Sequence, residues 1–199
     1  MKGIIGENSV TLCGICGGQP QISHEYAGRR FLTFPLMVSR LSGNVDILNV
    51  QIREGLMEPE PSEGEGLRIR GQLRSYNNRS GTGARLILSV YALSAERAEP
   101  EPFNEVILLG AICREPVFRR TPLGREICDL MLAVPRANGR ADYLPCVAWG
   151  QTARRASELK TGNTVRLRGR FQSRQYIKER DGKLEERTAF EVSVIELMD

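Results

Sequence analysis

The segment DYLPCVAWG, residues 142–150, contains the only tryptophan of the chain. If this segment is a β-strand, Tyr143 and Trp149 lie on the same face, because successive side chains of a strand point to opposite sides. The opposite face then carries the small and aliphatic residues that suit a core. Two large rings that face solvent can stack on flat partners, and a nucleic-acid base stacked on an aromatic ring gains about 1–3 kcal/mol.

Two further segments, GLRIRGQL (66–73) and TVRLRGRF (164–171), place arginine at alternate positions. As strands, they would point aliphatic residues inward and a row of guanidinium groups outward, with neighbours about 7 Å apart. Arginine pairs with phosphate through two parallel hydrogen bonds and stacks on flat rings. The simpler interpretation is that outward positions are merely solvated, but neither row contains an acidic residue, which solvation alone would tolerate. The rows comprise Arg68, Arg70 and Arg74 in the first half of the chain and Arg166, Arg168, Arg170 and Arg174 in the second.

Aromatic rings beside cationic groups on one face are the features with which proteins bind single-stranded nucleic acid without reading its sequence. We expect Tyr143 and Trp149 to lie next to the second arginine row if the strands form a barrel. The alternative interpretation is that the two rings cover a subunit interface or a loop. Further candidates for the nucleic-acid surface are Phe118, Arg119, Arg120, Arg136 and Tyr176, with Tyr76 as a weaker candidate in the first half of the chain.

The chain contains an internal repeat with an offset of 96 residues, and slightly different offsets pair the two arginine segments. So many matches in one register indicate two homologous domains. We predict a first domain over residues 1–97, a linker rich in Glu and Pro over 98–103, and a second domain over 104–199. Among the matched pairs are Gly14 and Gly110, Leu36 and Leu132, Arg40 and Arg136, and Asp46 and Asp142.

Each domain shows the period-two alternation of β-strands. Helical spacing predicts one short helix over 151–159, whereas the corresponding segment of the first domain has two prolines and no helical pattern. Five strands with a helix between the third and the fourth is the order of an OB-fold, so we predict an all-β protein of two tandem five-stranded OB barrels. A pair of SH3-like barrels and one long sandwich are the alternatives, and the repeat argues against the sandwich. The predicted strands cover residues 9–14, 31–39, 46–53, 66–75 and 85–93, and then 105–110, 127–135, 142–149, 164–174 and 188–197.

The composition is that of an ordinary globular protein, with 41% hydrophobic and 26% charged residues. No segment approaches the roughly 18 apolar residues of a membrane span, and the first residues lack the apolar run of a signal peptide, so we expect a cytoplasmic protein. The net charge of +4 is too small to argue for a polyanionic partner by itself. However, 24 of the 28 basic residues are arginine, which suits phosphate pairing.

Five cysteines, an odd number scattered through apolar stretches, indicate reduced thiols rather than disulfides. Cys13 and Cys16 have the spacing of half a zinc site, but the sequence has no second such pair and only one histidine, His24. We therefore predict no metal and no other cofactor. The acidic residues are spread out, and no Gly-rich loop ending in Lys-Ser/Thr is present, so we predict that the protein is not an enzyme.

The third strand of the first domain lacks the rings found in the second domain. Four glutamates also crowd the loop that follows this strand, where their charges would repel a phosphate chain. We therefore predict a divergent first domain with a structural or dimerisation role and weak binding of nucleic acid. Its outward positions are Ile47, Asn49, Gln51 and Arg53, and the glutamates are Glu58, Glu60, Glu63 and Glu65.

Over nearly its whole length, the second domain resembles the bacterial single-stranded DNA-binding proteins. The resemblance rests on NEVILLGAICREPVFRRTPLGREICDLMLAVPR, DYLPCVAWGQTARRASELKTG and LRGRFQSRQY, and the first domain resembles the family more weakly through NSVTLCG, LMVSR, DILNV and IRGQLRSYN. It implies an OB-fold that binds single-stranded DNA without sequence preference in replication, recombination or repair. By position, Tyr143, Trp149 and Tyr176 fall at the family's base-stacking aromatics, and Arg119 falls at a basic DNA-contacting position.

The resemblance also implies an assembly of four OB domains in the bacterial cytosol, so two domains per chain suggest a homodimer, as in the two-domain members of the family. Members commonly end in a flexible acidic tail that recruits replication and repair enzymes, whereas this sequence stops at VIELMD, and we expect that tail to be absent. Pro145 within a predicted strand predicts a bulge or an unpaired edge. The rival prediction is an interaction module of the primosome or conjugation type, in which a related OB-fold holds other proteins and DNA binding is secondary.

Overall fold

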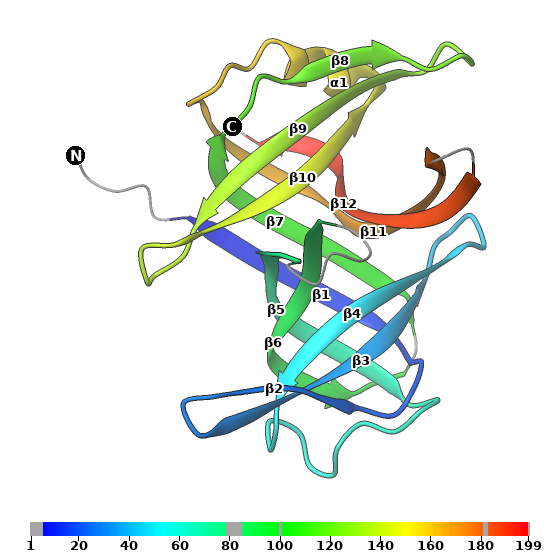
Figure 1. Cartoon of the computed structure of the whole chain (residues 1–199), viewed down its shortest axis with the longest axis vertical. Helices are drawn as coiled ribbons and strands as arrows, with labels where there is room; N and C mark the ends of the chain where they lie inside the picture. The colour runs from blue at the N-terminus through cyan, green and yellow to red at the C-terminus, as the bar shows by residue number, and fades with distance from the viewer. Residues whose placement is uncertain (1–5, 79–84, 100, 181–182, 199) are drawn as a thin grey trace. The chain divides into compact units, whose positions relative to one another are not determined.

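The computed structural model describes residues 6–78, 85–99, 101–180 and 183–198, which form twelve strands and one helix (Figure 1). The strands of the first repeat are β1 (Glu7–Cys16), β2 (Gln21–Tyr26), β3 (Arg29–Ser39), β4 (Val45–Arg53), β5 (Gly66–Asn77) and β6 (Leu86–Arg97). The second repeat contains β7 (Phe103–Ile112), β8 (Val117–Arg120), β9 (Glu126–Pro135), β10 (Ala141–Trp149), helix α1 (Gly150–Ser157), β11 (Thr164–Arg180) and β12 (Lys183–Met198).

Both repeats have the same strand order. In the first, the order β1-β5-β6-β4-β3 closes by pairing of β3 with β1, and in the second, β7-β11-β12-β10-β9 closes by pairing of β9 with β7. One pairing in each barrel is parallel, β4 with β6 and β10 with β12. A closed five-stranded barrel with this order is an OB-fold. The fold prediction is confirmed, and the SH3-like and sandwich alternatives are excluded.

Strands β2 and β8 are additions that the sequence analysis did not predict. Among the described residues, each pairs only with the strand that follows it, β2 with β3 and β8 with β9. Every residue of both strands is exposed, so their sequences contain no buried face that would produce an alternating pattern. Strands β11 and β12 are also longer than predicted and form a hairpin that runs to Arg180 and restarts at Lys183.

The core includes the inward residues that the alternation predicted, and also Ile127 and Val147 from the outward rows. Leu67, Ile69 and Leu73 of β5 are buried, as are Leu167 and Phe171 of β11. These side chains come from the strands that carry arginine on the opposite face, so the barrel interior fixes which way each arginine row points.

A glycine repeated in both barrels allows the barrel to close. Gly110 lies beside the pair Ala111–Ala133, where β7 meets β9, and a Cβ atom at Gly110 would lie 2.5 Å from the carbonyl oxygen of Ala133. Gly14 stands at the equivalent place in the first barrel, next to the carbonyl of Met37. The repeat retains glycine at both positions because no other residue fits so close to the neighbouring backbone.

Helix α1 follows β10 directly through Gly150, whose φ of 56° is a left-handed conformation that glycine adopts readily. Ala153 and Ala156 are buried, as the helical pattern predicted, while Leu159 lies beyond the end of the helix. Residues 54–65 of the first repeat contain no helix, also as predicted. The turn at Gly150 leaves Trp149 as the last residue of β10.

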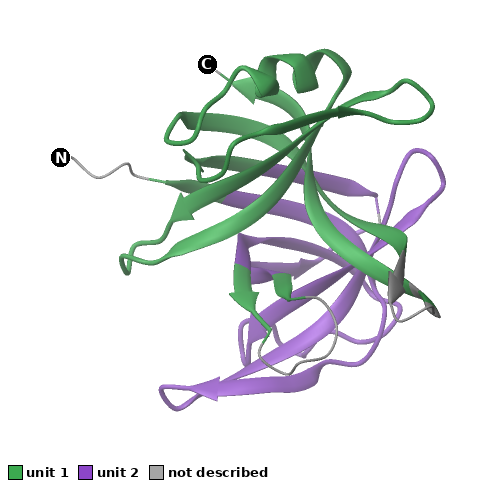
Figure 2. Cartoon of the chain, turned by 45° about the horizontal axis from the view of Figure 1, so that its top comes forward, with its two compact units in different colours: residues 1–8, 75–88, 107–199 green, residues 9–74, 89–106 purple. Residues whose placement is uncertain are grey.

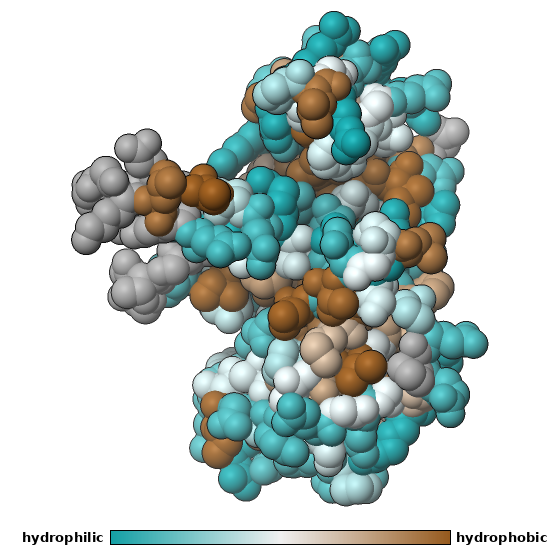
Figure 3. Space-filling model, turned by 90° about the vertical axis from the view of Figure 1, so that its right-hand side faces the viewer, coloured by the Kyte–Doolittle hydropathy of each residue, from teal (hydrophilic) through white to brown (hydrophobic). Residues whose placement is uncertain are grey.

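The chain divides into two compact units, one of residues 1–8, 75–88 and 107–199 and the other of residues 9–74 and 89–106 (Figure 2). These units interleave along the sequence, so they do not coincide with a linear boundary at 98–103. That the first domain is mainly structural and the second the main nucleic-acid-binding domain stays a prediction. No helix in the described part of the chain is long and apolar enough to cross a membrane. On the face shown in Figure 3, apolar residues form areas separated by hydrophilic ones, so hydropathy alone does not locate a site there.

Candidate nucleic-acid interface

Tyr143 and Trp149 lie on the outward face of β10, as predicted. Tyr143 is 51% exposed and Trp149 is 38% exposed, whereas Leu144, Cys146 and Ala148 on the other face are buried. The two rings are six residues apart on one strand, which corresponds to roughly 20 Å along its axis. Both rings are therefore accessible to a ligand, and an extended chain of several nucleotides would be needed to reach both.

Pro145, between the two rings, lies at an unpaired edge and not at a bulge. β10 pairs with β9 in an unbroken register over Ala141–Trp149, while its pairing with β12 covers only Cys146–Ala148. The amide of Tyr143 points away from β9, because it donates to the Ser75 hydroxyl at 2.7 Å. The nitrogen of Pro145, two residues further on, points the same way, so the proline interrupts no hydrogen bond of the ladder.

The strand register shows which residues share the outward face with the two rings. Trp149 lies opposite Ile127 of β9, and Ile127 lies opposite Arg119 of β8, so Arg119 and Trp149 belong to one row. The next row crosses five strands and consists of Val117, Asp129, Val147, Ser193 and Arg170.

The expectation that the second arginine row lies next to the aromatic strand is wrong. In the OB order the last strand inserts between the third and the fourth, so β12 separates β10 from β11. Arg170 still shares a row with Val147, with Ser193 between them. The rings and the guanidinium groups therefore occupy the same outward face, two strands apart, or about 10 Å.

Most arginines of the second row are paired with acids from neighbouring strands. Arg166 donates to Glu7 at 2.7 Å and Arg168 lies 3.2 Å from Glu196. The hydrogen bond from Arg166 holds the pKa of Glu7 below its usual value. The row itself contains no acid, and alternation along one strand cannot reveal these partners because they lie on β1 and β12. Such exposed pairs contribute only about 0–1 kcal/mol, so a phosphate can replace the carboxylate.

Arg170 and Arg174 differ from the rest of the row. Arg170 is exposed and makes no ion pair with any residue in the described ranges. The Arg174 guanidinium lies 5.5 Å from the ring centroid of Tyr176 and donates to Glu191 at 3.3 Å. Arg174 and Tyr176 therefore form a cation–π pair on the outward face of the β11–β12 hairpin.

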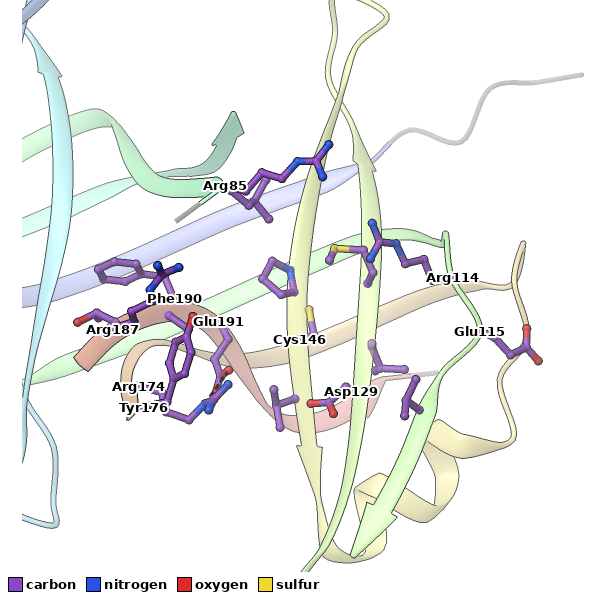
Figure 4. A pocket seen from close by; sticks show the side chains of 18 residues that line it. Arg85, Arg114, Glu115, Asp129, Cys146, Arg174, Tyr176, Arg187, Phe190 and Glu191 are labelled. Atoms are coloured by element: carbon purple, nitrogen blue, oxygen red, sulfur yellow. Dashed lines mark hydrogen bonds and ion pairs between the residues drawn. The ribbon is translucent and has the colours of Figure 1, made fainter. Parts of the chain in front are cut away.

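A groove of about 560 Å³ runs along this face of the second barrel. Figure 4 shows Arg174, Tyr176 and Phe190 on the β11–β12 side of the groove, with Arg114 and Asp129 on the other side of β10. Tyr143 and Trp149 do not line it, but they flank the β10 segment that does. The lining residues that the sequence analysis missed include Arg85, Arg114, Pro145, Val147, Arg187 and Phe190.

The register could have revealed one of these missed residues. Arg187 lies directly opposite Tyr176 across the β11–β12 hairpin, so a prediction of longer strands would have placed it beside the ring. Arg85 and Arg114 lie outside the strands, where no alternation applies. The groove therefore contains more positive charge than the arginine row alone indicated.

The three candidates on β8 do not lie on one face. Because side chains alternate along a strand, Phe118 and Arg120 point away from the face that carries Arg119 and Trp149. Arg120 pairs with Glu126 at 3.1 Å, and Glu126 also binds Arg154 of α1 at 2.5 Å, which lowers the pKa of Glu126. Arg119 pairs with Asp129 at 2.7 Å on the groove side.

Arg136 has a structural role. It donates through Nε to Asp142 at 2.7 Å and through Nη2 to the carbonyl of Ser75 at 3.2 Å, and Asp142 is fully buried. The first repeat contains the same pair, Arg40 with Asp46, joined at 2.7 Å. A buried carboxylate that loses its cation costs about 3–5 kcal/mol, so we leave Arg136 out of the proposed interface.

The arginine row of the first barrel is also paired across strands. Arg68 and Arg70 both approach Glu96 of β6, at 3.6 and 3.9 Å. The guanidinium of Arg74 lies 5.8 Å from the ring centroid of Tyr91. Tyr76 is 43% exposed and belongs to the unit of the second barrel, where burial raises its pKa.

The first barrel has rings, but not on its third strand. The outward positions of β4 are non-aromatic, as predicted. His24 of β2 stacks on Phe31 of β3 with ring centroids 4.8 Å apart, and Phe31 lies 6.1 Å from Tyr91 of β6. This cluster was not predicted, because its rings come from β2, β3 and β6 and not from the third strands that the repeat aligns.

The cysteines are free thiols. Burial raises the pKa of Cys128 to about 11 and raises that of Cys146 further. Arg68 donates to the sulfur of Cys13 at 3.2 Å, and Cys16 is buried. Within the described ranges, no three His, Cys, Asp or Glu side chains are grouped so that they could hold a metal ion.

The second barrel is similar in sequence to known proteins. Residues 103–198 match the single-strand binding protein family. Similar curated proteins include single-stranded DNA-binding protein 2 of Listeria innocua serovar 6a and the single-stranded DNA-binding protein of Oceanobacillus iheyensis, each 36% identical over 87 residues. These alignments cover 40% of this chain and 54% and 53% of the relatives, so the chain spans about half the length of the curated relatives it matches.

The whole chain is similar in fold to a two-barrel protein of known structure. The crystal structure of the wild-type single-stranded DNA binding protein from Thermus aquaticus superposes with a TM-score of 0.77 and 23% identity, covering 97% of this chain and 92% of that one. A deletion mutant of the same protein gives a TM-score of 0.76. Residues 103–198 of this chain are therefore similar in sequence to the single-strand binding protein family, and the whole chain shares the fold of the Thermus aquaticus protein.

Proposed function

We propose that the protein binds single-stranded DNA without sequence preference, as a non-catalytic protein that acts in replication, recombination or repair in the bacterial cytosol. The observation that carries this proposal is the outward face of the second barrel, where exposed rings flank a groove lined by arginines. The match of residues 103–198 to the single-strand binding protein family supports the same function.

The face provides both interactions that a single strand needs. Bases stack on Tyr143 and Trp149 of β10 and on Tyr176 of the hairpin, since every base has a π-face. Phosphates pair with Arg170, which has no described ion pair, and with Arg174, whose side chain is 49% exposed although its partner Glu191 is buried. Arg119 and Arg168 join them when a phosphate replaces Asp129 or Glu196, because both of these ion pairs are exposed.

The two barrels contribute unequally to DNA binding. The second barrel provides most of the affinity, and the first barrel, with its non-aromatic β4 and paired arginines, has a structural role with weaker binding. Two OB barrels per chain fit a homodimer, which brings four barrels together. Sedimentation equilibrium on the full chain tests this assembly, and a monomer at micromolar concentration would contradict it.

The lone tryptophan provides a direct test of DNA binding. Because Trp149 is exposed at one end of the groove-lining segment, oligo-dT should quench its fluorescence, and the affinity should fall steeply as salt rises. An oligonucleotide of mixed sequence should bind with similar affinity. Unchanged emission with saturating oligo-dT at low salt would refute the proposal and favour the protein-interaction module.

A further inference from the structure

We infer that Ser75 is a positioning residue for the nucleic-acid interface, because it holds the part of β10 that carries Tyr143. This inference rests on the proposed function. Ser75 comes from β5 of the first repeat, but residues 75–88 belong to the same compact unit as β10. The residue is 8% exposed, so it does not itself contact DNA.

All three polar groups of Ser75 bind residues of the β9–β10 hairpin. Its amide donates to the carboxylate of Asp142 at 2.7 Å, and its hydroxyl accepts the amide of Tyr143 at 2.7 Å. Its carbonyl accepts a hydrogen bond from Arg136 at 3.2 Å, and Arg136 in turn binds Asp142. One serine therefore binds both the side-chain carboxylate of Asp142 and the backbone amide of Tyr143.

The position of Tyr143 in the sheet explains why it needs this support. β10 pairs with β9 along its whole length, but β12 covers its other edge only from Cys146 onward. On that open edge Pro145 has no N–H, and the amide of Tyr143 would have no strand partner. The Ser75 hydroxyl takes the place of the missing strand. It holds the ring in its outward position before DNA binds, which reduces the entropy lost on binding.

A double-mutant cycle on the full chain tests this role. Oligo-dT affinity is measured through Trp149 fluorescence for the wild type, S75A, Y143A and the double variant. S75A should weaken binding about 3- to 10-fold, the usual range for one hydrogen bond, while the same change in the Y143A background should have less than a twofold effect. An equal factor in both backgrounds, or no loss in S75A, would overturn the inference.

Ser89 offers a matched control. It is a fully buried serine of β6 whose hydroxyl has no hydrogen-bond partner among the described residues, so S89A should leave the affinity unchanged. A loss in S89A equal to that in S75A would show that any buried serine has this effect and would contradict a specific role. If the wild type itself fails to bind oligo-dT, the proposed function is refuted. If the wild type binds and S75A binds equally well, only the inference about Ser75 is refuted.

Hydrogen exchange gives a measurement that needs no variant. In the wild type, the Tyr143 amide should exchange as slowly as amides bonded in the β9–β10 ladder, because Ser75 protects it. In S75A the Tyr143 amide should exchange faster, while the Leu144 amide, which points toward β9, keeps its protection. Rapid exchange of the Tyr143 amide in the wild type would overturn the inference even if S75A does not fold.

Discussion

Replacing Arg170 by alanine should weaken the binding of single-stranded DNA and reduce its salt dependence without changing stability. Arg170 is exposed and has no ion pair within the described ranges, so its removal leaves no acid without a partner. Each phosphate contact on a single strand adds about 0.7 to the slope of log K against log salt. R170A should therefore lower that slope by about 0.7, which changes the ratio of affinities at 50 and 200 mM salt by a factor of about 2.6.

Arg136 is the matched comparison, because the sequence also made it a candidate for the nucleic-acid surface but the structure gives it a different environment. Its partner Asp142 is fully buried, so R136A removes the only guanidinium that any described ion pair gives this carboxylate, at a cost of about 3–5 kcal/mol. R136A should therefore lower the free energy of unfolding by that amount. The salt slope of the folded fraction should stay at the wild-type value.

Both variants are measured by the same two assays. Oligo-dT titrations at several salt concentrations between 50 and 200 mM give the slope, and urea unfolding followed by circular dichroism gives the stability. The reasoning would be refuted if R170A kept the wild-type slope. It would also fail if R136A unfolded like the wild type and lost about 0.7 of the slope.

Three further predictions follow from particular contacts. W149A should weaken oligo-dT binding about 5- to 150-fold with an unchanged circular dichroism spectrum. Y26A, which removes a 73% exposed ring of the first barrel, should leave the affinity unchanged. Equal losses of affinity in both variants would contradict a special role of Trp149. G110A should lower the free energy of unfolding in urea by about 1–3 kcal/mol, because the added Cβ would lie 2.5 Å from the carbonyl oxygen of Ala133. In G18A the nearest atom to the added Cβ lies at 3.7 Å, so this variant should change stability little. At pH 8 a thiol reagent should label Cys128 and Cys146 only after denaturation, because burial raises the pKa of both and keeps them protonated, and fast labelling of both in the native protein would contradict this.

The sequence was sufficient for the fold and for the orientation of side chains on each strand. Alternation along a strand is a local property, so it correctly placed Leu167 and Phe171 inside the barrel and Tyr143 and Trp149 outside. The 96-residue repeat reflects a shared strand order, and that order led from five strands and a helix to the OB-fold. The glycine pair Gly14 and Gly110 was also visible as a match, although its reason was not.

Tertiary structure decided which residues on different strands become neighbours, because pairing between strands depends on barrel order and register, which alternation does not specify. It placed β12 between β10 and β11 and brought Glu7 and Glu196 against the second arginine row. It also placed Ser75, 68 residues before Tyr143 in the sequence, at the open edge of β10. A single sequence shows which side chains lie on each face of a strand. Hydrogen bonds and ion pairs between distant strands form only when the barrel closes. These contacts determine which arginines remain available to a phosphate.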